Sequence, residues 1–216
     1  MILLVGHYRE FVESRRGEYA ECVRRNAANP CLDEIHVFIE DTSDPAEVLA
    51  EVAVEHRAKL RFVELRRRLL FVDLFRYASD QLAGVAVAIA NADIFFDDTL
   101  GLLAGRDLFN QLLCLSRWDE REDGSPIFYD QPWSQDAWIF EAPLRPFDAA
   151  FHLGLPGCDN RIAAEAAAVG IAVSNPSRSI IAHHLHCSGT RNYNESKRIG
   201  GLVCGVPAEP LPPADE

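Results

Sequence analysis

The sequence lacks the signatures of several common protein classes. Its longest apolar stretch, residues 82–92, is well short of the roughly 20 residues that a transmembrane helix needs. It contains neither G-x-G-x-x-G nor G-x-x-x-x-G-K-[ST], which argues against a conventional dinucleotide fold and against a P-loop. Its 6 cysteines include no C-x-x-C pair, so their spacing supports neither a zinc ribbon nor a thioredoxin-type site.

Basic residues are also scarce. The chain has 21 Lys and Arg against 33 Asp and Glu, which gives a net charge of −12 at pH 7. Nucleic-acid affinity comes mainly from basic side chains that neutralise phosphates, so this balance predicts no nucleic-acid partner. The first residues carry no basic region, and their apolar run stops at Gly6, too early for a signal-peptide core. We therefore expect a cytoplasmic protein without a membrane span.

The first 90 residues alternate apolar runs with helical patterns. Strands are expected at residues 2–5, 35–39, 60–65 and 85–90, and helices at 10–26, 45–56 and 72–83. Successive β-α-β units predict a parallel sheet with right-handed crossovers and helices on both faces. The predicted fold class is α/β, with a Rossmann-like, mostly parallel sheet.

The second half is less regular. Strands are expected at residues 110–117, 137–141, 171–174 and 180–186, and a helix at 159–169. The polar and aromatic segment 118–134 is interpreted as an excursion that faces the substrate. No linker divides the chain, so residues 1–206 are expected to form a single domain, and the Pro-rich tail 207–216 is predicted to be disordered.

The most informative motif is Asn91-Ala92-Asp93, directly after the fourth expected strand. Side chains one residue apart at the end of a strand point the same way, so Asn91 and Asp93 are expected to share one hard cation through oxygen ligands. The alternative interpretation is that both residues only turn the chain and cap the next segment.

This arrangement resembles the GT-A fold glycosyltransferases, in which a D-x-D motif follows the fourth strand of a Rossmann-like half. Asn91 stands at the first position of that motif. The resemblance spans residues 2–193. It implies a divalent metal, Mn²⁺ or Mg²⁺, that binds the diphosphate of a nucleotide-sugar donor, and an acceptor that is a carbohydrate or another hydroxyl compound.

Two later segments keep the order of that family. The segment Ser134-Gln135-Asp136-Ala137-Trp138-Ile139-Phe140 resembles the strand that follows the acceptor-side loop of that family, which places Trp133 and Asp136 near the active site. Sugars stack on aromatic rings, so Trp133 and Trp138 suit an acceptor platform. The alternative is that both tryptophans are core residues. Asp159, at the start of a helix, corresponds to the acid that acts as base in inverting members. Its alternative role is that of a helix N-cap.

The remaining site residues follow from the same resemblance. The run His183-His184-Leu185-His186 ends the last expected strand, and alternation places His184 and His186 on one face as further metal ligands, unless these histidines are structural. Residues expected to bind the donor, in addition to Asn91 and Asp93, are Tyr8, Glu40, Asp41, Arg76 and Arg191.

The resemblance thus implies a hexosyltransferase-like glycosyltransferase with an inverting mechanism. Retaining chemistry remains open if Asp159 is only a cap. Two other functions also remain open: a noncatalytic nucleotide- or sugar-binding module on the same fold, and a sugar-phosphate nucleotidyltransferase.

Overall fold

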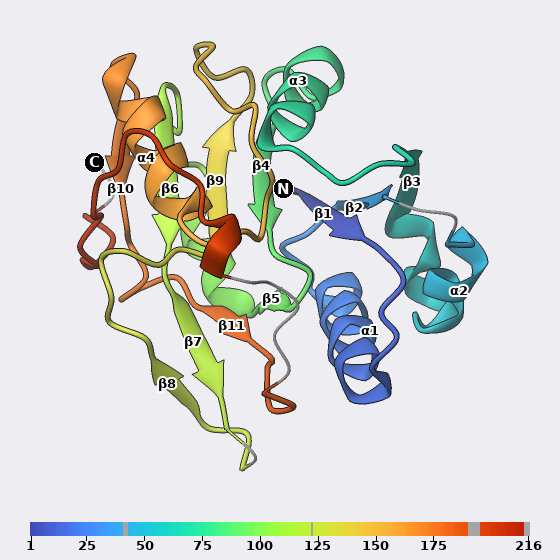
Figure 1. Ribbon diagram of the computed structural model, residues 1–216. Coiled ribbons are helices and arrows are strands. Elements are labelled where there is room, and N and C mark those ends of the chain that lie inside the picture. Colours follow the sequence, from blue (N-terminus) through green and yellow to red (C-terminus); the bar gives the residue numbers. More distant parts are fainter. Residues whose placement is uncertain (41–42, 122, 190–194, 214–216) are drawn as a thin grey trace.

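A seven-stranded sheet forms the centre of the protein. The computed structural model describes residues 1–40, 43–121, 123–189 and 195–213. The strand order is β10-β6-β9-β4-β1-β2-β3 (Figure 1). Strand β9 is antiparallel to both of its neighbours, and the other neighbouring pairs are parallel. The expected mostly parallel sheet is therefore confirmed. Its strands are β1 (Ile2–His7), β2 (Glu34–Ile39), β3 (Leu60–Glu64), β4 (Ala86–Ala90), β6 (Gln111–Leu115), β9 (Ala137–Glu141) and β10 (Ala172–Ser174).

Helices cover both faces of this sheet (Figure 1). Alternate residues of β1 belong to different core clusters, with Leu3 on the side of α1 residue Ala27 and Leu4 on the side of Leu74 from α3 and Ile162 from α4. Burial on both faces explains why the strands of the first half are continuous apolar runs. The helical elements are α1 (Glu13–Ala28), α2 (Pro45–Ala50), α3 (Phe71–Gln81) and α4 (Cys158–Ala168), with 3₁₀ turns η1 (Val54–Lys59), η2 (Asp98–Leu103) and η3 (Glu195–Lys197).

The helix expected at residues 45–56 is divided into α2 and η1. Asp44 caps α2 as the sequence suggests, since its side chain accepts a hydrogen bond from Ala46 N at 2.9 Å. The helix is interrupted at Val52 and Ala53. Val52 is buried in the core, and the backbone angles of Ala53 (φ −56°, ψ 141°) are not helical.

A second, smaller sheet has the order β5-β11-β7-β8. Figure 1 shows β7 and β8 extending away from the main sheet. The segment 118–134, expected to be an irregular excursion, is therefore partly a β-hairpin. The strands are β5 (Ile94–Phe96), β7 (Arg117–Glu120), β8 (Pro126–Phe128) and β11 (Ala182–His184).

Asn26 in α1 and Asn29, which follows its last residue, fix the edge strand β5. Asn26 Nδ2 donates to Ile94 O at 2.9 Å, and Asn26 Oδ1 accepts from Phe96 N at 3.0 Å. Asn29 Nδ2 donates to Phe96 O at 2.9 Å. These buried bonds satisfy the free backbone edge of β5 and hold the turn 91–93, which directly precedes it, beside α1.

The described part of the C-terminal tail, residues 207–213, makes fixed contacts with the domain. Glu209 N donates to Asn175 O, and Leu211 N donates to Ser179 Oγ, both at 2.9 Å. Leu211 also packs against the core. The paired backbone groups and the partly buried Leu211 favour an ordered arrangement of residues 207–213, whereas the composition of 207–216 predicts disorder. Residues 214–216 lie outside the described residues.

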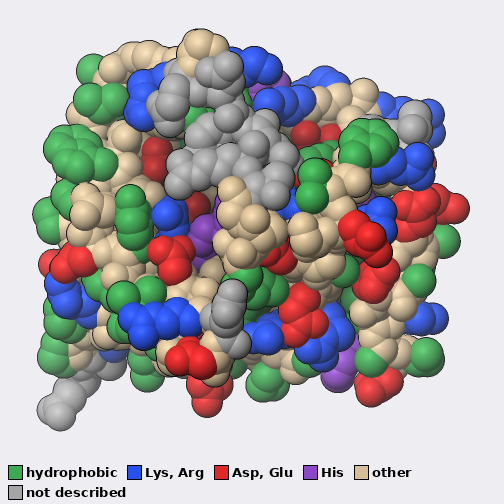
Figure 2. Space-filling model, turned by 60° about the horizontal axis from the view of Figure 1, so that its bottom comes forward, with side chains coloured by type: hydrophobic (Ala, Val, Ile, Leu, Met, Phe, Trp, Pro, Cys, Tyr) green, Lys and Arg blue, Asp and Glu red, His purple; other side chains and the backbone are tan. Residues whose placement is uncertain are grey.

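Charged side chains of both signs lie on the surface. Acidic and basic side chains are interspersed over the face shown in Figure 2. Within the described ranges, the helices are all too short or too polar to span a bilayer.

Candidate functional site

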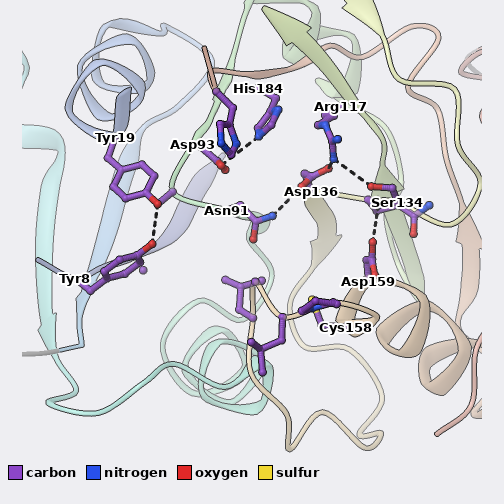
Figure 3. A pocket seen from close by; sticks show the side chains of 18 of the residues that line it. Tyr8, Tyr19, Asn91, Asp93, Arg117, Ser134, Asp136, Cys158, Asp159 and His184 are labelled. Carbon is purple, nitrogen blue, oxygen red and sulfur yellow. Dashed lines mark hydrogen bonds and ion pairs between the residues drawn. The ribbon is translucent and has the colours of Figure 1, made fainter. Parts of the chain in front are cut away.

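A cavity of about 510 Å³ opens where β1 and β4 end. Its walls come from the turn after β4, the segment before β9, the start of α4 and the end of β11 (Figure 3). Open α/β sheets bind their ligands beyond the carboxyl ends of the parallel strands, and this cavity lies there.

Three side chains on one wall form a cluster that suits a metal ion. One ligand atom from each of Asp93, His184 and His186 lies within 4.8 Å of the others. His184 Nε2 is 3.2 Å from Asp93 Oδ2, and the two imidazole rings are 5.3 Å apart. His186 Nε2 is buried without a hydrogen-bond partner among the described residues, so a bound cation would satisfy it. The role of these three residues as metal ligands remains a prediction, but one carboxylate and two imidazoles are suitable ligands for a divalent metal ion.

Asp93 is held by two positive groups. Arg15 Nη2, from α1, and His184 Nε2 both contact Asp93 Oδ2. Burial alone would raise the pKa of Asp93, but the hydrogen bond and charge of His184 and the charge of Arg15 hold it well below its usual range. Asp93 is therefore ionised and ready to bind a cation.

His184 is oriented by a carboxylate on the neighbouring strand. Its Nδ1 lies 2.7 Å from Asp119 Oδ1, and β11 runs parallel to β7 at this point. Burial lowers the pKa of His184, but the hydrogen bonds to Asp119 and Asp93 raise it to about 9. The protonated ring places Nδ1 on Asp119 and Nε2 on Asp93, and loss of the Nε2 proton would make this nitrogen a ligand for a cation.

His183 points to the opposite side of β11. It stacks on Phe95 with ring centroids 4.5 Å apart, and its nitrogens lie 2.5 Å from Glu120 and 3.2 Å from Asp97. Strand alternation therefore separates a structural histidine from the histidine of the cluster, as the pattern indicates.

The amide of Asn91 is turned toward Asp136, and the cation that Asn91 and Asp93 are expected to share remains a prediction. Asn91 Nδ2 donates to Asp136 Oδ1 at 2.9 Å (Figure 3). The chain leaves β4 at Ala90 and enters a turn closed by Ile94 N and Asn91 O at 3.1 Å, so the alternation of a strand no longer applies. Asn91 still lines the cavity.

Asp159 lies on the wall opposite the cluster, in the first turn of α4 (Figure 3). Its carboxylate accepts hydrogen bonds from Gln135 N at 3.3 Å and Asn160 N at 3.0 Å. Burial, and then the charge of Asp136, raise its pKa to about 6. The N-cap interpretation is wrong, because Gly157 holds the cap position with φ 81°, a conformation that favours glycine.

Asp136 lies between the two walls, where Arg117 neutralises it. Arg117 Nη1 donates to Asp136 Oδ2 at 3.2 Å, and Arg117 Nε donates to Asp119 Oδ1 at 2.8 Å. A continuous set of hydrogen bonds thus runs from Asn91 through Asp136, Arg117 and Asp119 to His184. This network connects Asn91, in the turn after β4, to His184 of the cluster.

The two tryptophans have different places. Trp138 is fully buried in β9, and its ring makes an edge contact with Phe71 at 4.8 Å, so the core alternative is confirmed for this residue. Trp133 is 56% exposed, which rules out a core role. It lies beside Gly205 and is not among the described residues that line the cavity.

Tyr8 and Glu40 line the part of the cavity at the ends of β1 and β2. Tyr8 Oη lies 2.7 Å from Tyr19 Oη. Glu40 Oε2 accepts a hydrogen bond from Leu69 N at 3.1 Å, and a Cβ on Gly6 would lie only 2.7 Å from Glu40 Oε1. Glycine at position 6 is thus what allows this carboxylate to approach the end of β1.

Some expected donor residues are elsewhere. Arg76 is exposed on α3 and does not line the cavity, because its position in the helix faces solvent. Arg68, which is not among the expected donor residues, does line the cavity. Asp41 and Arg191 lie outside the described residues.

Sequence analysis missed Arg15, Tyr19, Arg117 and Asp119. Arg15 and Tyr19 belong to an ordinary helical pattern. Arg117 ends the strand expected at residues 110–117, and Asp119 belongs to the segment 118–134, interpreted as an excursion. Each reaches the site only through contacts between distant parts of the chain, so no local pattern could have indicated them.

Comparisons with known proteins identify the fold. No profile of a known protein family matches the chain, and no curated protein matches its sequence. Among solved structures, the mannosyltransferase PcManGT from Pyrobaculum calidifontis, in complex with GDP-Man and Mn²⁺, is similar with a TM-score of 0.58 and 16% identity. Residues 1–349 of TarS from S. aureus, in complex with UDP-GlcNAc, are similar with a TM-score of 0.58 and 14% identity.

The similarity covers most of this chain but only part of the others. It spans 89% of this chain and 58% of the PcManGT chain, and 92% of this chain and 61% of the TarS chain. The chain therefore has the GT-A fold, as its resemblance to that class implied.

Proposed function

We propose that this protein is a metal-dependent glycosyltransferase that moves a sugar from a nucleotide-diphosphate donor to an acceptor hydroxyl with inversion. The observation that carries the proposal is the pairing of two walls across one cavity. One wall presents Asp93, His184 and His186, and the other presents Asp159, whose pKa is about 6. Similar folds hold GDP-Man with Mn²⁺ and UDP-GlcNAc, which supports a nucleotide-sugar as the donor.

The proposed reaction assigns a task to each wall. The sugar C1–O bond to the β-phosphate breaks and its electron pair leaves with the nucleoside diphosphate, while the acceptor oxygen forms the new bond to C1. Asp159 accepts the proton of the acceptor hydroxyl as general base. Asp93, His184 and His186 would hold the metal, which stabilises negative charge on the leaving diphosphate when bound.

The three proposed metal ligands favour Mn²⁺ over Mg²⁺. Mg²⁺ takes mainly oxygen ligands, whereas two imidazoles and one carboxylate suit a transition metal better. Tyr8 and Glu40 are proposed to contact the nucleoside, and Asp136 the acceptor.

A thermal-shift screen followed by turnover tests the proposal. Nucleoside diphosphates and nucleotide-sugars are added with and without Mn²⁺. A ligand at a hundredfold excess over its Kd stabilises the fold by about 2.7 kcal/mol, which for this size is about 5–10 °C in Tm. A metal-dependent shift, with release of nucleoside diphosphate from the same nucleotide-sugar, is the expected result.

Other outcomes decide against the proposal. A shift without any turnover or hydrolysis of the nucleotide-sugar would identify a noncatalytic binding module. Release of pyrophosphate from a nucleoside triphosphate and a sugar phosphate would identify a nucleotidyltransferase. No shift with any nucleotide would leave only the fold.

The rate should depend on pH in the way that a base on α4 requires. Since Asp159 must be ionised and its pKa is raised to about 6, kcat/KM should rise with pH below about 6 and level off above it. Asp136→Asn removes a charge that contributes to this pKa, so the midpoint should move to lower pH. A profile that is flat between pH 4.5 and 7.5 would exclude this role.

Asp119→Asn should weaken metal binding by about 10–100-fold, because Asp119 orients His184 but is not itself one of the three proposed ligands. Titration with Mn²⁺, followed by electron paramagnetic resonance, measures the change. Glu120→Gln is the matched control, since Glu120 contacts His183 on the other side of β11. Equal Mn²⁺ affinity in both variants would contradict the orienting role.

A further inference from the structure

Arg15 is a buried guanidinium in the wall of the cavity. Its side chain is only 6% exposed. Nη2 contacts Asp93 Oδ2, while Nη1 donates to Glu18 Oε2 at 2.7 Å and to Leu185 O at 3.2 Å. The group also lies 4.6 Å above the ring of Tyr19. These contacts fix its position beside the proposed metal ligands.

One N–H group of the buried Arg15 side chain, that of Nε, donates no hydrogen bond to the described residues. Buried donors are nearly always satisfied, and a buried arginine has five N–H groups to satisfy. Arg15 also lines the cavity, so an anion that binds there lies beside a guanidinium with an unused donor.

Asp93 would have to bind both Arg15 and a metal ion with the same carboxylate. Arg15 Nη2 and His184 Nε2 both lie on Oδ2, and a metal held by Asp93 would need the same carboxylate. Two positive charges a few ångströms apart repel each other strongly in a partly buried site. Arg15 therefore lowers the affinity for a metal as long as no anion is present.

A diphosphate reverses this relation. Arginine binds phosphate oxygens with paired, charge-assisted hydrogen bonds, and a diphosphate adds the negative charge that a metal and a guanidinium need in order to lie together. The same side chain that opposes the metal alone thus favours the diphosphate.

We propose that Arg15 binds the diphosphate of the donor and that, without donor, it competes with the metal for Asp93. This inference rests on the proposed function. It makes the occupancy of the metal site depend on the nucleotide, so that metal and donor bind together.

Two binding measurements on Arg15→Gln test this. Mn²⁺ affinity without nucleotide, measured by electron paramagnetic resonance, should rise about tenfold, within the range typical of coupled sites. The affinity for nucleoside diphosphates in EDTA, measured by calorimetry over a panel of the common bases, should fall by a similar factor. A merely structural role would weaken both or change neither, so the opposite signs are diagnostic.

Two other variants serve as controls. Arg15→Lys keeps the charge beside Asp93, so its Mn²⁺ affinity should stay close to that of the wild type. Arg25→Gln removes an arginine of the same helix that pairs with Glu21 at 2.6 Å and stacks on Phe95, away from the cluster. Both affinities should be unchanged in Arg25→Gln.

The outcomes separate the two levels of the proposal. Wild-type protein that binds no Mn²⁺ even with a diphosphate would contradict the metal site itself, and Arg15 with it. Wild-type protein that binds both, with unchanged affinities in Arg15→Gln, would overturn only the role of Arg15. If Arg15→Gln does not fold, the ¹⁵N resonance of Arg15 Nε in the wild type decides. It should shift when a diphosphate is added in EDTA, and an unchanged resonance overturns the proposal.

Discussion

Asp159→Asn is expected to lower kcat by about 10²–10⁴-fold, the contribution typical of a general base. The substitution keeps the shape of the side chain and an oxygen that accepts from the backbone at the start of α4, where Gln135 N and Asn160 N donate in the native protein. It removes only the group that takes the proton. The nucleotide-sugar Kd should therefore stay within about twofold, because the proposed metal and nucleoside contacts lie on other walls of the cavity.

Release of nucleoside diphosphate in the presence of acceptor measures kcat, and calorimetry measures the Kd. Glu165→Gln is the matched control on the same helix, since Glu165 pairs with Arg161 at 3.3 Å and does not line the cavity. Its kcat should be that of the wild type. An undiminished kcat in Asp159→Asn would remove Asp159 from the role of base.

The stereochemistry of the product tests the same assignment independently. With Asp159 as base, the acceptor attacks C1 from the face opposite the leaving diphosphate, and the anomeric configuration inverts. Proton NMR of the first product, before mutarotation, reads this directly. A product with retained configuration would contradict the inverting mechanism even if Asp159→Asn is inactive.

The sequence predicts the main sheet well because burial on both faces leaves a clear mark. The runs that become β1, β2 and β4 are apolar at nearly every position, and the helices between them set the parallel direction. The second sheet leaves no such mark. Strands β7 and β8 are short, and their residues are mostly only partly buried, so they have neither an apolar run nor a regular alternation.

The sequence predicts those residues of the candidate site that stand in short local motifs. Asp93, His184, His186 and Asp159 stand in short motifs, and the structure brings all four to one cavity. Asn91 differs because the direction of its side chain depends on where β4 ends, and that point is set by the pairing of β4 with β1 and β9. Arg15 and Asp119 act through partners more than 60 residues away, which a local pattern does not reveal.

Asp93→Asn is expected to affect both stability and ligand binding. Asp93 is the carboxylate on which the buried Arg15 and His184 converge, and removing one member of a buried ion pair costs about 3–5 kcal/mol. For a chain of this size, that lowers Tm by on the order of 10 °C. An amide also lacks the charge that holds a cation, so the additional Tm shift that Mn²⁺ gives with a bound nucleotide should disappear.

Differential scanning fluorimetry with and without Mn²⁺ and nucleoside diphosphate separates the two effects. Asp97→Asn is the control, since Asp97 lies 3.2 Å from His183 on the opposite side of β11 and should keep the metal-dependent shift. The low pKa of Asp93 gives the sign with pH: its contribution to stability is present above the ordinary Asp pKa of about 4 and is lost as the pH falls. The difference in stability between wild type and Asp93→Asn should therefore be largest near neutral pH and narrow in acid. A variant that loses stability but keeps the full metal-dependent shift would show that Asp93 stabilises the fold without binding the metal.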